Sequence, residues 1–544
     1  MVIGFTAGKA DLMISGRAVF TGIGNSTKPG AIAIAGNRIV ALGDTEAELE
    51  GLIGPRTRIL RYGNHLIMAG FQDFHLHVLL GSLFHDSVNL LSAASEEEAA
   101  RMTKAFADAR PDDPWIFGFS WHHAFWETKT LPHRSTLDRY LSDRPVFLLN
   151  AEGHGAWLNS RALMELGITS DSPNPPYGQI HKDESGVPTG FLYETAMSLA
   201  QSAFCLPHAR KHKLLRSFLE KAAKLGITSV SDMFPMPGLQ LDNLDIYREY
   251  EANGELTARI HFQTALNGDL AYPRKLRETC SSDKLRFSGL KQYLDGVPTL
   301  YTALLLDPYS DRPETKGDTL IPPDLVTEWI LQADKEGFRV RLHACGDGAV
   351  RLGLDCFEAA RLRNGARDSR HTIEHVEVIC RSDLRRFAEL GVVASMQPEH
   401  IAATQSFKDN PYLVRLGKER EPLTWPIRTL MNNRAHLAFG SDYPVVELDP
   451  MLGIYRAATR LHNDGQPEGG WNPKERLGVA DALRAYTSGS AYGMFTERDT
   501  GTLEVGKLAD IIVLDRNIIE TPVEEIRETK VLMTMMDGKI VYEA

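Results

Sequence analysis

The middle of the chain repeats one unit, an amphipathic helix that ends near a glycine and runs into a short apolar strand. The unit recurs at residues 212–233, 323–347, 382–400 and 429–446. A helix followed by a strand rich in Val, Ile and Leu is typical of a parallel sheet. This many repeats favours an α/β fold of the (β/α)₈ barrel type. A doubly wound sheet is the alternative, which is weakened because no GxGxxG motif follows an early strand.

The two ends of the chain show a different pattern from this middle part. Short apolar runs broken by turn residues, which are typical of β-strands, occur at residues 10–60, 501–519 and 531–544. The last run contains an Asp-Gly pair, which is a hairpin signal. Because chain ends often lie close together, the pattern predicts one small β domain built from both termini.

The chain has 544 residues, which is too long for a single hydrophobic core. We therefore predict a small β-sandwich domain over residues 1–68 and 497–544, and a (β/α)₈ barrel over residues 69–496. Residues 85–205 break the repeat with aromatic stretches and clusters of Pro and Gly. We expect this segment to be a large insertion over the barrel mouth, where such insertions often form a lid or a specificity pocket.

Polar residues stand at the ends of several strand-like runs. His75 and His77 follow an apolar run, and their spacing places both side chains on one face of a strand. An isolated HxH pair is weak evidence, but the same position recurs in later runs, at Lys291, His343, His375 and Asp442. Active sites of barrels lie at the carboxyl ends of the strands. Nitrogen and oxygen donors gathered there suit a Zn²⁺-type metal ion.

These motifs resemble the amidohydrolase superfamily of metal-dependent hydrolases through most of the chain. "GFQDFHLHV" is similar to the PGFxDxHxH motif of the superfamily, "GSDYPV" to its GSDxPV segment and "GTLEVGKLADIIVLD" to its C-terminal stretch. Within the superfamily the chain looks most like amidohydrolase family 3, the YtcJ-like branch, through "AEGHGAWLNSRAL", "HACGDGAV" and "ASMQPEH". N-substituted formamide deformylation is the best-described activity in that branch.

The resemblance implies a role for each strand-end residue. His75 and His77 would bind one metal ion, and His343 and His375 a second. Lys291, as a carbamate formed with CO₂, would bridge the two ions, and without that carbamate the site would hold one ion. Asp442 would contact a metal ion and handle the proton. Two Zn²⁺ ions per chain are expected, although such ligands also accept Fe, Mn and Co.

The implied reaction is hydrolysis of an amide-type, non-peptide C–N bond by metal-activated hydroxide. N-acyl or N-formyl amides with a hydrophobic group are the expected substrates. Two alternatives stay open: a deaminase or a lactonase or esterase on the same scaffold, and a regulatory homologue without catalysis.

Four residues outside the ligand set are candidates for substrate binding. His154 lies in the insertion, and His400 and Tyr443 follow later strands. Trp121 belongs to an aromatic cluster that forms either an apolar substrate pocket or a small core of the insertion.

Charge and cysteine content restrict the partners and the compartment. The net charge of −11 and the lack of a basic run argue against nucleic acid as a partner. No leader-like or membrane-spanning apolar run is visible, and five scattered cysteines fit a reducing cytoplasm. We expect a small-molecule substrate as the partner, with a homodimer as an open alternative to a monomer.

Overall fold

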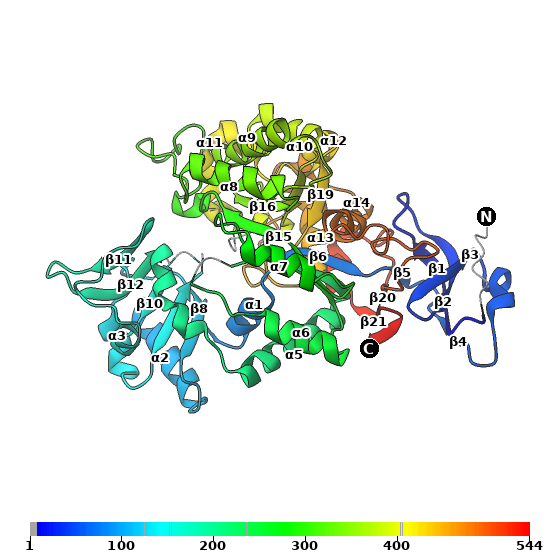
Figure 1. The fold of residues 1–544 in the computed structure, drawn as a ribbon, viewed down its shortest axis with the longest axis horizontal. Coiled ribbons are helices and arrows are strands. Elements are labelled where there is room, and N and C mark those ends of the chain that lie inside the picture. The colour runs from blue at the N-terminus through cyan, green and yellow to red at the C-terminus, as the bar shows by residue number, and fades with distance from the viewer. Residues whose placement is uncertain are drawn as a thin grey trace.

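The computed structural model describes residues 8–544 except 124–125, 152, 154, 236–237, 403 and 405. At its centre lies an eight-stranded parallel sheet whose strands neighbour one another in chain order (Figure 1). The strands are β6 (Phe71–Leu76), β13 (Ile227–Asp232), β14 (Arg259–Ala265), β15 (Leu285–Tyr293), β16 (Val340–Ala344), β17 (Thr372–His375), β18 (Val393–Met396) and β19 (His436–Phe439). This arrangement confirms the predicted α/β fold with a nearly closed parallel barrel.

The two edge strands of this sheet, β6 and β19, come together at their carboxyl ends. Two backbone N–H groups bond across the junction: Asp442 N to His75 O at 2.6 Å, and His77 N to Tyr443 O at 2.9 Å. Gly440 makes the approach feasible, because a Cβ atom at this position would lie 2.4 Å from the backbone nitrogen of His75. The segment after β19 is thereby fixed against the end of β6.

The helices between the strands follow the pattern that the sequence predicts. In α5 (His208–Lys224) the buried side chains Leu214, Leu215, Phe218 and Leu219 form one apolar stripe. Gly226, after α5, has a φ of +77°, a left-handed conformation that ends helices at low steric cost. Further helices are α6 (Leu244–Asn253), α7 (Ala271–Thr279), α8 (Pro323–Lys335), α9 (Asp347–Asn364), α10 (Arg386–Leu390), α11 (Pro411–Arg420), α12 (Ile427–Asn432), α13 (Pro450–Thr459), α14 (Val479–Arg484) and α15 (Ser490–Gly493).

Both ends of the chain contribute strands to one eight-stranded sheet. The N-terminal part supplies β1 (Leu12–Phe20), β2 (Lys28–Ala35), β3 (Arg38–Gly43), β4 (Arg58–Arg61) and β5 (Leu66–Ala69), and the C-terminal part supplies β20 (Ile511–Leu514), β21 (Val531–Met536) and β22 (Lys539–Glu543). β5 and β20 pair antiparallel and join the two parts. The predicted β-sandwich arrangement and the predicted domain boundaries stay predictions.

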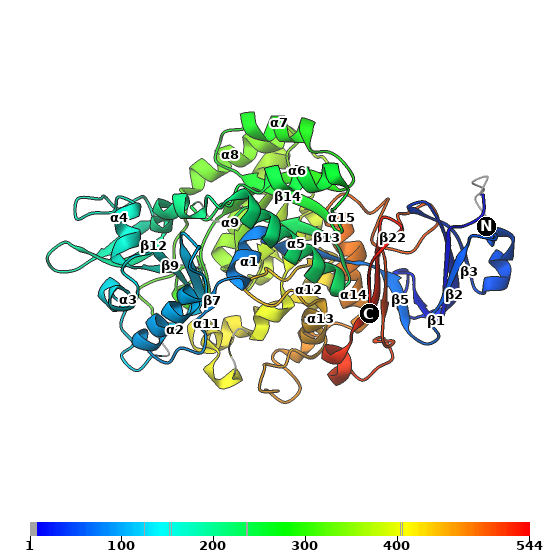
Figure 2. The ribbon, with the colours of Figure 1, turned by 90° about the horizontal axis from the view of Figure 1, so that it is seen from below.

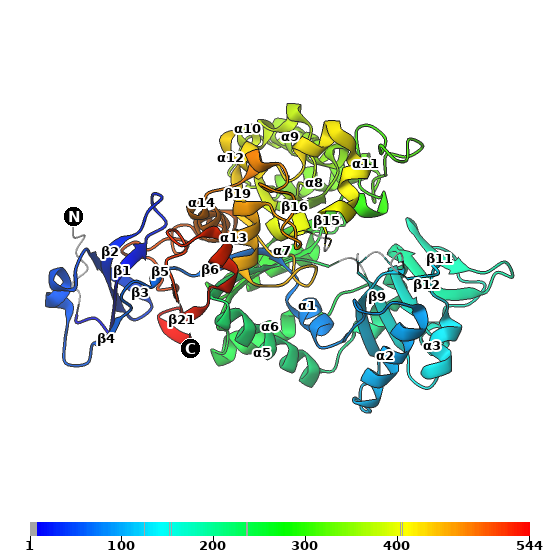
Figure 3. The same ribbon diagram turned by 180° about the vertical axis from the view of Figure 1, so that it is seen from behind.

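Residues between the first and second barrel strands form a third sheet of six strands with its own core. Its strands are β7 (Val88–Asn89), β8 (Ile116–Trp121), β9 (Val146–Asn150), β10 (Gly155–Leu158), β11 (Gly178–Lys182) and β12 (Pro188–Glu194), with helices α1 (Val78–His85), α2 (Glu96–Asp108), α3 (Arg134–Tyr140) and α4 (Ser160–Glu165). This sheet and the terminal sheet lie on opposite sides of the barrel (Figures 2 and 3). In the described part of the chain, no helix is long and apolar enough to cross a membrane.

Candidate metal centre

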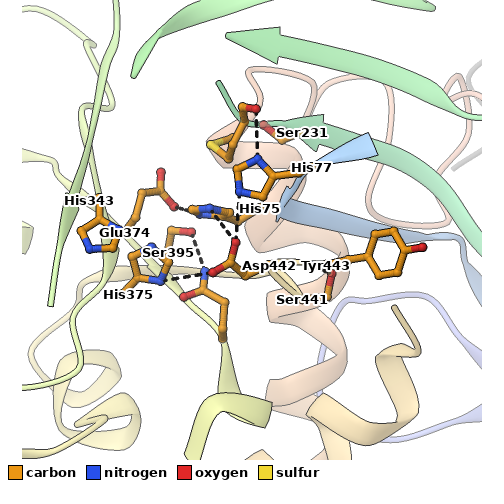
Figure 4. Close-up of polar contacts among 12 residues, drawn as sticks. His75, His77, Ser231, His343, Glu374, His375, Ser395, Ser441, Asp442 and Tyr443 are labelled. Atoms are coloured by element: carbon orange, nitrogen blue, oxygen red, sulfur yellow. Dashed lines mark hydrogen bonds and ion pairs between the residues drawn. The ribbon is translucent and has the colours of Figure 1, made fainter. Parts of the chain in front are cut away.

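Two histidines of the first barrel strand point at one carboxylate (Figure 4). His75 lies within β6 and His77 directly after it, so the i, i+2 spacing places both rings on the same side. The Nε2 atoms of His75 and His77 each lie 3.3 Å from Oδ1 of Asp442. The HxH pair and the Asp after β19 therefore meet at the junction where β6 and β19 come together.

His375 reaches the same carboxylate from the end of β17. Its Nδ1 atom lies 4.0 Å from Oδ2 of Asp442, and its ring centroid lies 4.9 Å from that of His75. His75, His375 and Asp442 are buried, and each offers a ligand atom within 4.8 Å of the other two. Such a group of two imidazoles and a carboxylate suits a divalent transition metal ion.

The backbone at two of these residues adopts a conformation that is uncommon outside glycine. The φ angle is 76° at His375 and 59° at Asp442. Such left-handed residues cost conformational free energy and cluster at functional sites, where the surrounding structure holds them in place. Here the turn after each strand directs the side chain into the cluster.

A buried carboxylate orients His75 from behind. Glu374 Oε2 accepts a hydrogen bond of 2.7 Å from His75 Nδ1, and Glu374 Oε1 accepts one of 2.5 Å from Arg341 Nε. Burial by itself would raise the pKa of Glu374, but Arg341 and His75 hold it well below its ordinary value. An ionised Glu374 fixes the His75 proton on Nδ1 and leaves Nε2 available as a ligand atom.

Sequence reasoning did not identify Glu374, because adjacent residues of a strand point to opposite faces and His375 was the predicted ligand. Its contact is with a residue 299 positions away, on another strand. The available signal was the carboxylate itself, since an acidic residue in a fully buried strand needs a partner.

Asp442 is held as a carboxylate by the histidines that surround it. Burial raises the pKa of its carboxyl group, but His75 and His77 more than offset this and hold the pKa well below its ordinary value. Burial lowers the pKa of His375, which also lies beside His343. Neutral imidazole and ionised carboxylate are the forms in which these residues bind metal ions.

Lys291 lies in β15, with its side chain inside the barrel. Its Nζ atom is buried and has no hydrogen-bond partner in the described part of the chain. Burial lowers the pKa of this amine to about 8. A buried amine without a partner is costly for a protein to keep, and an amine that loses its proton readily is the form that reacts with CO₂. These features fit the carbamate that the resemblance implies.

His343, at β16, lies beside His375 but also has other partners. The centroids of the two rings are 4.4 Å apart. The Nε2 atom of His343 donates a hydrogen bond of 3.1 Å to the carbonyl oxygen of Gly296, and it lies 3.4 Å from Cys345 Sγ. Asp295, His343 and Cys345 form a second buried group with ligand-type atoms. The sequence did not predict that Asp295 and Cys345 belong to this group.

The carboxylate of Asp295 is already occupied by the backbone. It accepts hydrogen bonds from the N–H groups of Leu304 and Cys345 at 3.0 Å each, and of Gly346 at 2.9 Å. We therefore interpret Asp295 as the group that shapes the loop after β16.

His400 stands at the edge of the centre, where it had been predicted to contact substrate. Its Nε2 atom lies 3.8 Å from Asp442 Oδ2, and its Nδ1 atom lies 3.8 Å from Glu377 Oε1. Burial would lower the pKa of His400, but Glu377 and Asp442 raise it above its ordinary value. A role in substrate binding stays a prediction, as do the metal-ligand roles.

The structure places two of the predicted substrate contacts in packed surroundings. Trp121 is fully buried in the core of the insertion, where its ring packs on Trp126 and its indole N–H donates to the carbonyl of Leu148 at 2.9 Å. Tyr443 is also buried, and its ring packs against Gly81 and points away from the histidines (Figure 4). Both aromatic side chains are packed in a core, and their roles in substrate binding stay predictions. His154, the remaining candidate, lies outside the described residues.

The model of the family described as "Amidohydrolase family" matches residues 63–542. The chain belongs to the amidohydrolase family. This confirms the predicted resemblance and, at the level of the reaction class, a hydrolase that acts on amide-type C–N bonds.

Two curated relatives match nearly the whole chain. The protein LONG AFTER FAR-RED 3 of Arabidopsis thaliana is 30% identical, over 98% of this chain and 92% of the relative. The N-substituted formamide deformylase of Arthrobacter pascens is 27% identical, over 98% of both chains. Among solved structures, an uncharacterized metal-dependent hydrolase of Pyrococcus horikoshii OT3 has a TM-score of 0.76 at 26% identity, over 94% of this chain and 99% of that one.

Proposed function

We propose that this amidohydrolase cleaves the C–N bond of small N-acyl or N-formyl amides that carry a hydrophobic group, with two divalent ions as cofactors. The observation that carries the proposal is the buried cluster of His75, His375 and Asp442 at the ends of three barrel strands. The N-substituted formamide deformylase, which matches nearly end to end, supports the choice of substrate.

The ligand set divides between two ions in this proposal. His75 and His77 would hold one ion, His343 and His375 the other, Asp442 would contact the first, and Lys291 would bridge both as a carbamate. The unpartnered, buried amine of Lys291 supports the bridge. When bound, such ions supply Lewis acidity that polarises a carbonyl group and lowers the pKa of water. Imidazole and carboxylate donors favour Zn²⁺, with Fe, Mn and Co as alternatives.

The residues of the chain supply proton transfer and orientation. Asp442 takes a proton from the attacking water at its carboxylate and passes it to the leaving nitrogen, since an amine leaves only when it is protonated. Glu374 holds His75 in one orientation through its hydrogen bond to Nδ1. His400, 3.8 Å from Asp442, can donate a hydrogen bond to the substrate carbonyl. The products are one carboxylate and one amine.

The insertion over residues 85–205 would close the site from above. It leaves the barrel through α1, which begins directly after His77, at the carboxyl end of β6. Exclusion of bulk water would strengthen the electrostatic interactions within the site. We further propose that the protein acts in the cytoplasm on a freely diffusing small molecule, as a monomer or a homodimer.

A hydrolysis screen of metal-loaded protein tests the proposal. The panel pairs N-formyl and N-acyl amides with the matching esters, lactones and amino-substituted heterocycles. We expect amides to be cleaved with the highest kcat/KM, and the Asp442→Asn variant to lose that activity while it keeps bound metal. Preferred cleavage of esters or lactones, or release of ammonia from the heterocycles, would contradict the proposed reaction.

A further inference from the structure

A cavity of about 130 Å³ lies beside the metal centre, next to the ends of β13 and β14. His77 forms part of its wall, and the remaining wall comes from α1, from the ends of β13 and β14, from the segment after β13, and from α6 and α7. Because His77 also lies 3.3 Å from Asp442, the cavity adjoins the place where the reaction occurs. A substrate bound at the centre can therefore extend one end into this cavity.

The formally charged residues of the described cavity wall are both acidic. Asp232 and Asp242 belong to it, whereas its described lining residues include neither lysine nor arginine. The Asp232 carboxylate is almost fully buried, and its recorded donors, such as the backbone N–H of Val78 and the hydroxyl of Tyr247, both at 2.8 Å, are neutral. Such a wall repels a carboxylate and attracts an ammonium group.

Several oxygen acceptors around the cavity lack a donor. Gln263 Oε1, Asn243 Oδ1 and Thr264 Oγ1 are buried without a hydrogen-bond partner in the part of the chain that the structure describes. All three residues line the cavity, and Gln263 is only 5% exposed. Buried acceptors without donors are costly, so a ligand that brings N–H groups would relieve that cost.

The rest of the wall is apolar and small. Leu80, Met233, Leu239 and Phe262 contribute hydrocarbon surface. An apolar cavity of roughly 150 Å³ holds a benzene molecule. The cavity beside His77 therefore has room for a compact hydrocarbon group about the size of one six-membered ring.

We propose that this cavity binds the amine half of the amide, as an N–H group or ammonium that carries one compact hydrocarbon substituent. The inference rests on the proposed function, because amide hydrolysis by one water yields a carboxylate and an amine that is protonated on release. The acceptor oxygens and carboxylates face the nitrogen, the apolar residues surround its substituent, and the acyl half points the other way.

The first test measures binding without turnover. Metal-loaded protein is titrated calorimetrically with cyclohexylammonium and with cyclohexanol, in the wild type and in the Gln240→Lys and Gln332→Lys variants. Gln240 lines the cavity, whereas Gln332 is exposed on α8 and serves as the matched control. We expect the wild type to prefer the ammonium, and Gln240→Lys to weaken ammonium binding at least tenfold relative to Gln332→Lys. Equal binding of both probes, or equal effects of the two variants, would overturn the proposal.

The second test changes the size of the cavity. Tyr272 lines it and is 50% exposed, and Tyr177, in the insertion, is 49% exposed and serves as a control. Tyr272→Ala should raise kcat/KM several-fold for amides with a bulky amine half and leave those with a bulky acyl half unchanged, whereas Tyr177→Ala should change neither. A gain for the bulky acyl half alone would assign the cavity to that half and overturn the proposal. If no amide is hydrolysed, the proposed function fails, and the calorimetric test still decides what the cavity binds.

Discussion

The barrel and the insertion both gather histidine or aromatic side chains, but they arrange them in opposite ways. At the barrel, His75, His375 and Asp442 come from three different strand ends, and their ligand atoms face one another within 4.8 Å. In the insertion, Trp121 and Trp126 are buried in a closed core, and each indole N–H donates to a backbone carbonyl. The first group presents ligand-type atoms that suit a metal ion. In the second group, both indole N–H groups already have hydrogen-bond acceptors within the protein.

The difference follows from topology. Parallel strands of a barrel end at one rim, so polar residues at the strand ends converge there even when they are hundreds of positions apart in the chain. The sheet of the insertion has its own helices, α2 and α3, to cover it, and its large side chains pack inward. Residue type alone therefore does not identify a site, whereas position at the end of a parallel strand does.

The largest effect is expected for His75, one of the three residues of the barrel cluster. Replacement of His75 by Ala removes a proposed ligand atom and the partner of both Asp442 and Glu374. We expect bound metal to fall below half of the wild-type content and turnover to be lost for every substrate. Elemental analysis and kcat measured on the same preparation check this. A variant with normal metal content would remove His75 from the ligand set.

Asp442 has two proposed roles, as a metal ligand and as the group that moves the proton, and one substitution can separate them. Asp442→Asn keeps the size of the side chain but lowers its basicity, so kcat should fall by a factor on the order of 10² or more while much of the metal stays bound. Steady-state kinetics beside metal analysis measures both effects. Near-normal turnover in this variant would exclude Asp442 as the group that moves the proton.

Glu374 should have an intermediate effect, because it acts through His75. Glu374→Gln leaves the cation of Arg341 unpaired in the core and weakens the orientation of His75, so metal affinity or kcat/KM should fall roughly 10- to 100-fold. Glu358, exposed on α9, provides the control variant Glu358→Gln. Equal metal affinity in both variants would show that Glu374 only stabilises the core.

Trp121 should have the smallest effect on the reaction. Trp121→Phe loses a buried hydrogen bond and some packing, and we expect the free energy of unfolding to fall by about 1–3 kcal/mol. Metal content and the ratio of kcat/KM between a small and a bulky amide should stay within about twofold of the wild type, since Trp121 is fully buried. A clear change in that ratio would indicate that Trp121 contributes to the substrate site.

The parts of the molecule that follow local periodicity could be predicted from the sequence. The helices that end just before Gly226, Gly337 and Gly391 and the strands that follow them are confirmed in position. The HxH spacing determines one face of a strand, so the convergence of His75 and His77 on a shared partner could also be foreseen.

Contacts between distant segments could not be predicted in this way. The bond between Glu374 and His75 depends on how two non-adjacent strands face each other inside the barrel. Tyr443 directly follows Asp442, whose left-handed φ of 59° interrupts the strand, so the alternation of a strand could not tell in which direction the Tyr443 side chain points. With Asp442 directed inward, Tyr443 packs outward against Gly81 in α1.

The dependence of turnover on bound metal tests the central claim most directly. Protein is stripped with a chelator and reloaded stepwise with Zn²⁺ in the presence of bicarbonate, and kcat is measured at each bound stoichiometry for the wild type and for Lys291→Met. We expect no turnover in stripped wild-type protein, recovery that reaches its maximum at about two ions per chain, and a limit of about one ion in Lys291→Met. Full turnover in protein that retains no metal would contradict the account.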